Sequence, residues 1–227
     1  MGARANLCGV RKQRWRRMTV WLHVVTSVGW MGQALALFTL LAISRATEDG
    51  EIRVAATSMA HEIDTLLLAP LANASAFTGF MLAAGTAWGF TRHWWVLAKF
   101  VITLVQLYAG IFLLSGALQD SVAAARTGEQ APVALVAGTA LMASAIAFQA
   151  WLSIAKPWGK ARSGGKLPTA PTWVFVAAVA APLADITAGL LLGFPLPALS
   201  LIVLIVQLVR RRRQLRPTPA EVPAPAL

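Results

Sequence analysis

The chain is poor in the residues that usually build soluble enzymes and metal centres. Only 13% of its 227 residues are charged, with 9 acidic residues against 20 Lys and Arg, and it has one cysteine and three histidines. Cys8 by itself excludes an intrachain disulfide and a cysteine metal cluster, so thiols do not reveal the redox compartment. Hydrophobic residues make up 57% of the sequence, and the mean hydropathy is +0.64. This balance is typical of a membrane protein.

Long uncharged runs predict the membrane spans. A helix needs about 20 apolar residues to cross a hydrocarbon core of roughly 30 Å. The runs of sufficient length are Met18–Ser44, Thr65–Thr91, Phe100–Gln119 and Gln130–Ala155. The first run is also much longer than the core of about 7 to 15 residues in a cleaved signal peptide, so we expect it to remain as an anchor.

A further run, from Leu167 to Val209, is long enough for two passages through the bilayer. Its only charge is Asp185, and at about 1.5 Å per residue it is roughly twice a bilayer long. Gly193, Pro195 and Pro197 offer the turn, because proline cannot continue a helix interior. The sequence therefore predicts a fifth span and a short sixth span.

These runs predict an all-α membrane helix bundle with a four-helix core and a C-terminal hairpin. The predicted segments are a basic tail (1–17), the four-helix core (18–155), a basic loop (156–171), the transmembrane hairpin (172–209) and a basic, Pro-rich tail (210–227).

The charges predict the orientation of the bundle. With six spans, the basic clusters before the first span, after the fourth and after the last, together with Arg92, all fall on one side. The loops 45–64 and 120–129 on the other side are mainly acidic. Because basic loops stay in the cytoplasm, both termini are expected inside the bacterial plasma membrane. Every tryptophan except Trp30 maps to the same cytoplasmic boundary. The positive charge thus favours contact with anionic lipids over binding to nucleic acid.

Several polar residues interrupt the predicted spans. In the first span His23, Ser27 and Trp30 follow helical spacing, with Gln33 beside them. In the third span Lys99, Thr103, Gln106 and Gly110 repeat this spacing, while Asn73 and Gln149 lie in the second and fourth. These stripes are expected to face protein, and the simplest role for the amides is interhelical hydrogen bonding.

His23 and Lys99 are the strongest candidates for chemistry in the four-helix core. An ionisable group in the hydrocarbon is costly and marks a functional site by default. Both residues lie at similar depth in the cytoplasmic half, so they are expected to meet in one pocket with His93 at its rim. An imidazole can bind haem iron or a metal, or transfer protons near neutral pH. Alternatively, the Lys99 side chain extends to the boundary and has no chemical role.

Two other acidic positions stand out. Asp185 follows Pro182 by three residues in the fifth span; proline frees a carbonyl there, so the acid could accept a cation or proton, or hydrogen-bond a neighbouring helix. On the outer side, His61, Glu62 and Asp64 could ligate a metal, but a solvated acidic cap explains them more simply.

Short motifs resemble known membrane families over about the first four spans. The segment from Leu22 to Gly32, which begins Leu-His and ends Trp-Met-Gly, resembles the first helix of HemJ-type protoporphyrinogen oxidases and of CopD-type copper-resistance proteins. The segment from Trp95 to Phe100 resembles the third-helix motif of the HemJ-type enzymes. The Lys156–Lys160 segment is most similar to a group of uncharacterised bacterial integral membrane proteins.

The HemJ-type resemblance implies that His23 and Lys99 form a functional pair. The sequence departs from that family at Leu97, where a histidine is usual, and at Tyr108, near the place of a later histidine. The hairpin 172–209 is also foreign to it.

Three functions are compatible with the sequence. The first is an accessory subunit of a larger membrane complex, or a homo-oligomer, packing through small-residue faces such as 143–150. The second is a haem b or porphyrin site in the core, with His23 as axial ligand, Lys99 on a propionate or as second ligand, and Trp30 and Gln106 nearby. The third is a transporter for a small solute or metal ion, lined by Asp185, Lys99 and His23.

Overall fold

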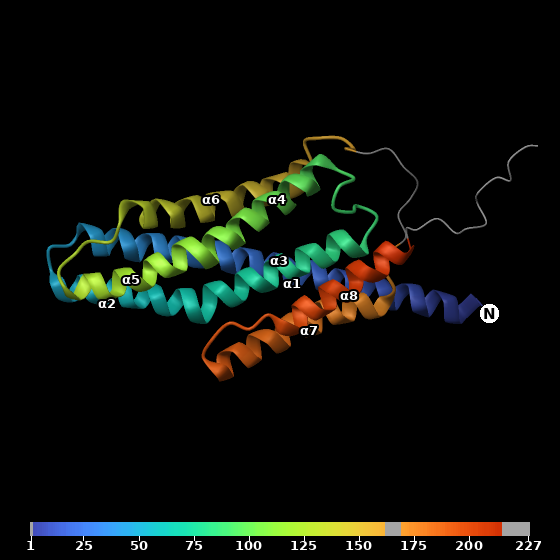
Figure 1. Cartoon of the computed structure of the whole chain (residues 1–227). Coiled ribbons are helices and arrows are strands. Elements are labelled where there is room, and N and C mark those ends of the chain that lie inside the picture. Colours follow the sequence, from blue (N-terminus) through green and yellow to red (C-terminus); the bar gives the residue numbers. More distant parts are fainter. Residues whose placement is uncertain (1, 162–168, 215–227) are drawn as a thin grey trace, which may run out of the picture.

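The protein is an all-α membrane helix bundle (Figure 1). The computed structural model describes residues 2–161 and 169–214, with side chains from residue 9 onward. The described elements are α1 (Gly2–Ala46), α2 (Gly50–Ile63), η1 (Asp64–Leu68), α3 (Ala69–Gly85), α4 (Trp94–Tyr108), η2 (Ala109–Leu114), α5 (Ser115–Arg126), α6 (Val133–Ala155), α7 (Thr172–Leu192) and α8 (Ala198–Gln214). The predicted Pro-rich tail beyond Arg216, and the basic residues Arg162 and Lys166, lie outside the described residues.

Six continuous helices result from this order, because two π-helical segments join their neighbours without a break. The first, η1, joins α2 to α3, and the second, η2, joins α4 to α5. Pro70 lies just after η1 and has no N–H to continue the α-helical pattern. The all-α class and the four-helix core with an added hairpin are therefore confirmed.

Five helices are long and apolar enough to cross a membrane. They are Gly9–Ala46, Gly50–Gly85, Trp94–Arg126, Val133–Ala155 and Thr172–Leu192. The sixth, α8, has only the segment Ala198–Val209 before its arginine cluster, which is about 18 Å of helix and less than a hydrocarbon core of roughly 30 Å. The segment predicted as a short sixth span is therefore α8, which is not among the helices long enough to cross a membrane.

A non-helical segment between α7 and α8 explains how so short a helix can follow a full-length span. Gly193, with φ of 77°, ends α7 in the left-handed conformation that glycine favours. The chain then folds back along α7, since a Cβ added at Gly189 would lie 3.2 Å from the Phe194 carbonyl oxygen. Pro195 and Pro197 remove two backbone donors from this non-helical segment, which lowers its cost in an apolar setting. The helix α8 begins only after this segment, at Ala198.

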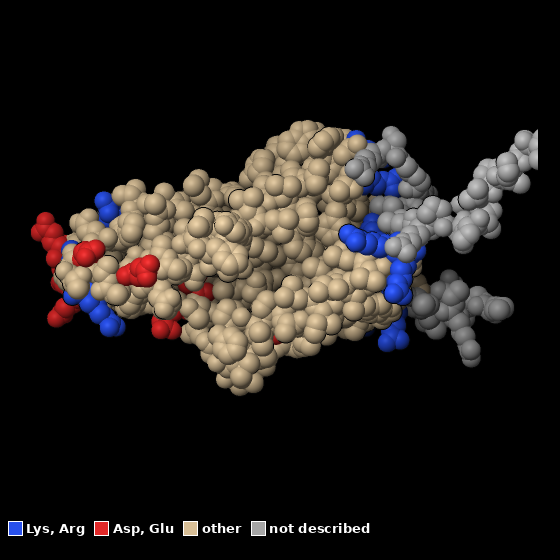
Figure 2. All heavy atoms as spheres, viewed as in Figure 1, with Lys and Arg blue, Asp and Glu red and all other residues tan. Residues whose placement is uncertain are grey.

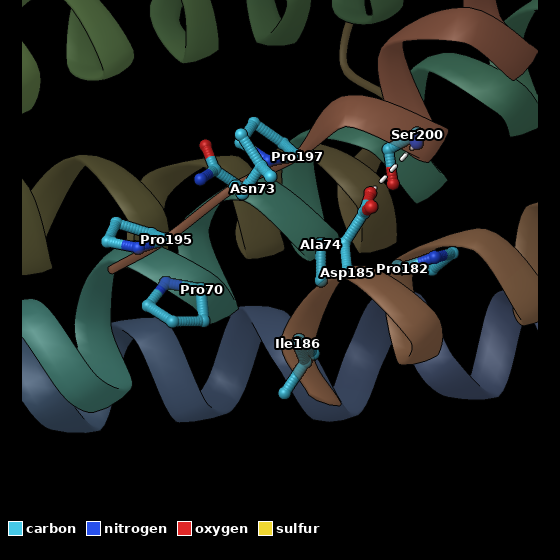
Figure 3. Close-up of a pocket in the computed structure, with 10 residues that line it drawn as sticks. Pro70, Asn73, Ala74, Pro182, Asp185, Ile186, Pro195, Pro197 and Ser200 are labelled. Carbon is cyan, nitrogen blue, oxygen red and sulfur yellow. Dashed lines mark hydrogen bonds between the residues drawn. The ribbon is translucent and has the colours of Figure 1, made fainter. Parts of the chain in front are cut away.

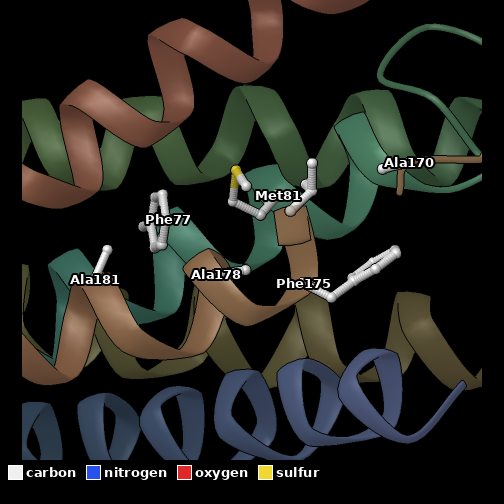
Figure 4. Packing of buried hydrophobic residues seen from close by; sticks show 7 residues of the cluster. Phe77, Met81, Ala170, Phe175, Ala178 and Ala181 are labelled. Carbon is white, nitrogen blue, oxygen red and sulfur yellow. The ribbon is translucent and has the colours of Figure 1, made fainter. Parts of the chain in front are cut away.

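The helix α1 is central to the packing. It contacts α2, α3, α6 and α7, and the hairpin of α7 and α8 lies against α3 (Figure 1). Where the hairpin meets α3, Phe77 and Met81 pack against Phe175 and Ala178, all of them buried (Figure 4). The small side chain of Ala178 lets the two helices approach closely.

Charge separates the two ends of the bundle. Lys and Arg crowd one end, whereas Asp and Glu lie toward the opposite end with a few basic side chains (Figure 2). At the basic end, Arg211 of α8 donates to the carbonyls of Ala83 and Ala84, which is where a cation stabilises the C-terminus of α3. Lys12 donates to Thr169 at 2.7 Å. The basic clusters at the start of α1 and at the end of α8 therefore lie at one end of the bundle.

Arginines at the acidic end hold the loops together. Arg53 is buried and donates to the carbonyls of Thr47 at 2.8 Å and Gly128 at 3.1 Å. Arg45 donates to the Ala131 carbonyl at 2.8 Å. Arg53 thus links the loop after α1 to the loop before α6, and Arg45 links the end of α1 to that second loop. Both residues therefore have a structural role beyond their effect on topology.

Candidate functional site: polar contacts inside the bundle

A first polar seam joins α1 to α3. The His23 Nδ1 lies 3.0 Å from the Ser75 carbonyl oxygen and 3.2 Å from the Thr78 hydroxyl. The Ser27 and Ser75 hydroxyls are 2.7 Å apart. Because a carbonyl oxygen can only accept, the bond to Ser75 requires the proton of the neutral imidazole to be on Nδ1. We call His23, Ser27, Ser75 and Thr78 the α1/α3 seam.

A second polar seam joins α4 to α6. Lys99 donates to the Ser153 hydroxyl at 2.6 Å, and the Thr103 hydroxyl donates to Gln149 Oε1 at 2.9 Å. One turn further along, Gln106 donates to the Met142 carbonyl at 3.0 Å and accepts from Gln149. Both amides are buried, with 5% of Gln106 and 7% of Gln149 exposed. The stripe read from the helical spacing thus faces α6, and these residues form the α4/α6 seam.

His23 and Lys99 belong to different seams. The Lys99 ammonium is close enough to act electrostatically on the imidazole, but each group hydrogen-bonds a separate helix pair. Neither of the two cavities described below is lined by either residue. His93 contacts neither residue: its Nδ1 is 3.2 Å from the Trp88 carbonyl, and its ring packs on Trp88 and Trp95.

The surroundings of His23 do not fit a haem ligand. A Cβ added at Gly79 would lie 3.0 Å from Cε1, 3.5 Å from Nδ1 and 3.7 Å from Nε2 of the ring. The Cε1 edge of the ring, between its two nitrogens, thus packs against the backbone of α3. Nδ1 is already bonded to the Ser75 carbonyl, and neither cavity adjoins the ring. Of the other residues considered for a haem, Gln106 is held by Met142 and Gln149.

Asp185 and Asn73 lie together beside the hairpin. They line a cavity of about 260 Å³ between α3, α7 and the start of α8 (Figure 3). The Asp185 carboxylate is 9% exposed and accepts from the backbone N–H of Leu199 at 3.0 Å and of Ser200 at 2.8 Å. It therefore caps α8 from another helix, a position where a carboxylate also suits the helix dipole.

Trp30 and Gln33 are near the middle of α1. Trp30 is 3% exposed and packs with Ala34 and Met142, and its indole N–H has no partner within the described residues. Gln33 is half-buried. No contact in residues 9–161 or 169–214 supplies a hydrogen bond to its amide.

Several contributors to the seams carry no signal in the sequence. Ser75, Thr78 and Ser153 are hydrogen-bond partners of His23 and Lys99. Serine and threonine in a helix commonly hydrogen-bond their own backbone, so their presence in the sequence does not predict an interhelical contact. Pro70 is the only local sign of η1. Among the described residues, no group of three or more His, Cys, Asp or Glu could hold a metal ion. His61, Glu62 and Asp64 therefore do not form a metal site.

The fold and these contacts define a polytopic α-helical membrane protein. Comparisons with protein-family models, with curated proteins and with solved structures find no match for the chain. What the protein does must therefore follow from its own contacts.

Proposed function

We propose that the protein is an accessory subunit of a larger complex in the bacterial plasma membrane, and that a transmembrane helix of a partner protein packs on α1 around Gly32 and Gln33. The observation that carries this proposal is the unpaired amide of Gln33. The basic end, where α1 begins and α8 ends, faces the cytoplasm and its anionic lipids.

Gln33 lies deep in the first span. It follows Arg17 by 16 residues and precedes Arg45 by 12, which are about 24 Å and 18 Å along the helix. An amide that finds no partner in hydrocarbon costs several kcal/mol. Gly32 beside it is exposed and has no atom within 4 Å of an added Cβ. Small residues next to a polar side chain are what membrane helices use to associate, so a partner helix can approach closely and bond the amide.

The other polar residues support a structural role. His23, Lys99, Gln106 and Gln149 each hydrogen-bond a neighbouring helix, and both oxygens of Asp185 are used by α8. A transport path or a redox centre would need some of these groups to be available to a substrate or cofactor. Gln33, Asn73 and the Trp30 indole are the candidates without a hydrogen-bond partner among the described residues, and of these Gln33 is the one that lies beside an exposed glycine, Gly32.

Orientation is tested by reporter fusions. We expect alkaline phosphatase inserted at Gly50, at the acidic end, to be active, because that loop lies outside the cytoplasm in this orientation. A green fluorescent protein fused after Gln214, at the basic end, should fluoresce. A silent fusion at Gly50 together with an active phosphatase after Gln214 would reverse the orientation.

Replacing Gln33 with leucine is expected to weaken the complex without harming the chain itself. An interhelical hydrogen bond in a membrane contributes about 0.6–2 kcal/mol, so the dissociation constant should rise about 3- to 30-fold. Blue native electrophoresis of gently solubilised membranes should show less of the complex and more of the 24.1 kDa chain alone.

Thr39→Val is the matched control for Gln33→Leu. Thr39 is exposed on the same helix, but its hydroxyl already donates to the Leu35 carbonyl at 3.0 Å, so its loss should leave the complex intact. A photo-crosslinker at Gly32 should form adducts with a different protein. Adducts only with further copies of this chain, or a complex indifferent to Gln33→Leu, would contradict the proposal.

A further inference from the structure

A cavity lies within the four-helix core at the level of both π-helical segments. It encloses about 350 Å³ of empty space, which includes the part that is open to the surface. Asp64 and Leu68 of η1 and Gly110 and Leu114 of η2 line it. Such segments often occur at functional sites, and here two of them, far apart in the sequence, border one space.

The cavity separates two packed parts of the core. Trp30, Ala34 and Met142 belong to one buried cluster, and Leu37, Leu118 and Leu135 to the other. Leu68 and Leu114, from the two π-helical segments, pack against both clusters. At Gly110 an added Cβ would meet only the Met142 methyl group, at 3.8 Å. The missing side chain of Gly110 therefore leaves room that the neighbouring residues do not fill.

Asp64 is the one ionisable residue that lines this space, and the remaining lining is apolar apart from Thr139. The Thr139 hydroxyl is already bonded to the Val136 carbonyl at 2.8 Å. Near the Asp64 carboxylate are the Ser115 hydroxyl and His61, which precedes Asp64 by about one helical turn. No ion pair joins Asp64 to a Lys or Arg among the contacts of residues 9–161 and 169–214. A carboxylate in apolar surroundings is costly without a cation.

We infer that the cavity binds a lipophilic cation, such as a short alkyl chain carrying a protonated amine. The ammonium group lies on Asp64, and the alkyl chain lies against Leu37, Leu118 and Leu135. Charge complementarity selects the cation, because a neutral ligand leaves the carboxylate unpaired and an anion is repelled. This inference goes beyond the accessory role and does not depend on it.

Hexylamine and its neutral counterpart hexanol test the inference. The protein is held in nanodiscs of zwitterionic lipid, and each compound is titrated while thermal unfolding is followed, since a ligand of the folded state raises the melting temperature. We expect hexylamine to bind at least about tenfold more tightly than hexanol, because bonds to charged groups are the stronger ones. In Asp64→Asn this preference should vanish while hexanol affinity stays within about twofold, since the apolar lining is unchanged.

Two variants at Gly110 show whether the ligand occupies this cavity. Gly110→Leu places a side chain in the space and should abolish the stabilisation by both compounds. Gly110→Ala is its matched control, because the Cβ fits at that position and most of the volume remains. Partitioning of the amine into lipid is the same for all variants, so differences between them report the cavity. Equal affinity for amine and alcohol in the wild-type protein, or unchanged binding in Gly110→Leu, would overturn the inference.

Discussion

Replacing Asp185 with leucine is expected to lower the free energy of unfolding by about 2–4 kcal/mol, because each buried N–H left without a partner costs about 1–3 kcal/mol. The carboxylate accepts from both Leu199 and Ser200 at the start of α8. Pro197 precedes that helix and has no side-chain acceptor, so nothing local can replace the cap. The α7–α8 hairpin should loosen from α3 first.

Asparagine at position 185 should have a smaller effect, about 1 kcal/mol, because its single carbonyl oxygen still accepts from one of the two amides. Thr187→Leu is the control: Thr187 is exposed two residues later and bonds only the Leu183 carbonyl of its own helix. Reversible unfolding in mixed detergent micelles with SDS measures all three variants. Normal stability of Asp185→Leu with lost biological activity would instead assign the acid a functional role.

The sequence predicted much of the fold because the length of each uncharged run can be counted directly from the residues. The uncharged runs located the four core helices, and the two prolines after Gly193 located the turn of the hairpin. It also predicted which residues of α4 share a face, since the spacing of Lys99, Thr103 and Gln106 follows the helical repeat. Each of these features is determined by the residues of a single helix and does not require knowledge of its neighbours.

The sequence could not predict which helix each polar face would meet. Depth in the membrane can be counted from the boundary, but rotation about the helix axis relative to the other helices cannot. His23 and Lys99, expected from their depth to share a pocket, therefore hydrogen-bond different helices, α3 and α6 respectively. The partner of Asp185 is a pair of backbone amides, brought to it only by the return of the chain along α7.

The α4/α6 seam is expected to be the other large contributor to stability. Gln149 accepts from Thr103 and donates to Gln106, so Gln149→Leu leaves the Gln106 carbonyl without this donor and removes the acceptor of the Thr103 hydroxyl. We expect the unfolding free energy to fall by about 1–3 kcal/mol. Gln33→Leu, the same substitution at an unpaired amide, should cause no loss in the isolated chain.

A double-mutant cycle distinguishes the hydrogen bond from packing in this seam. In Gln106→Leu with Gln149→Leu both amides are gone, so neither is left without its partner, and the double variant should be less destabilised than the sum of the single ones by about 1 kcal/mol. Leucine is close to glutamine in size, which limits the cavity that either change creates. Unfolding in SDS-containing micelles again gives the free energies. Strict additivity would show that the two amides contribute independently and that the seam between α4 and α6 is held by its apolar contacts.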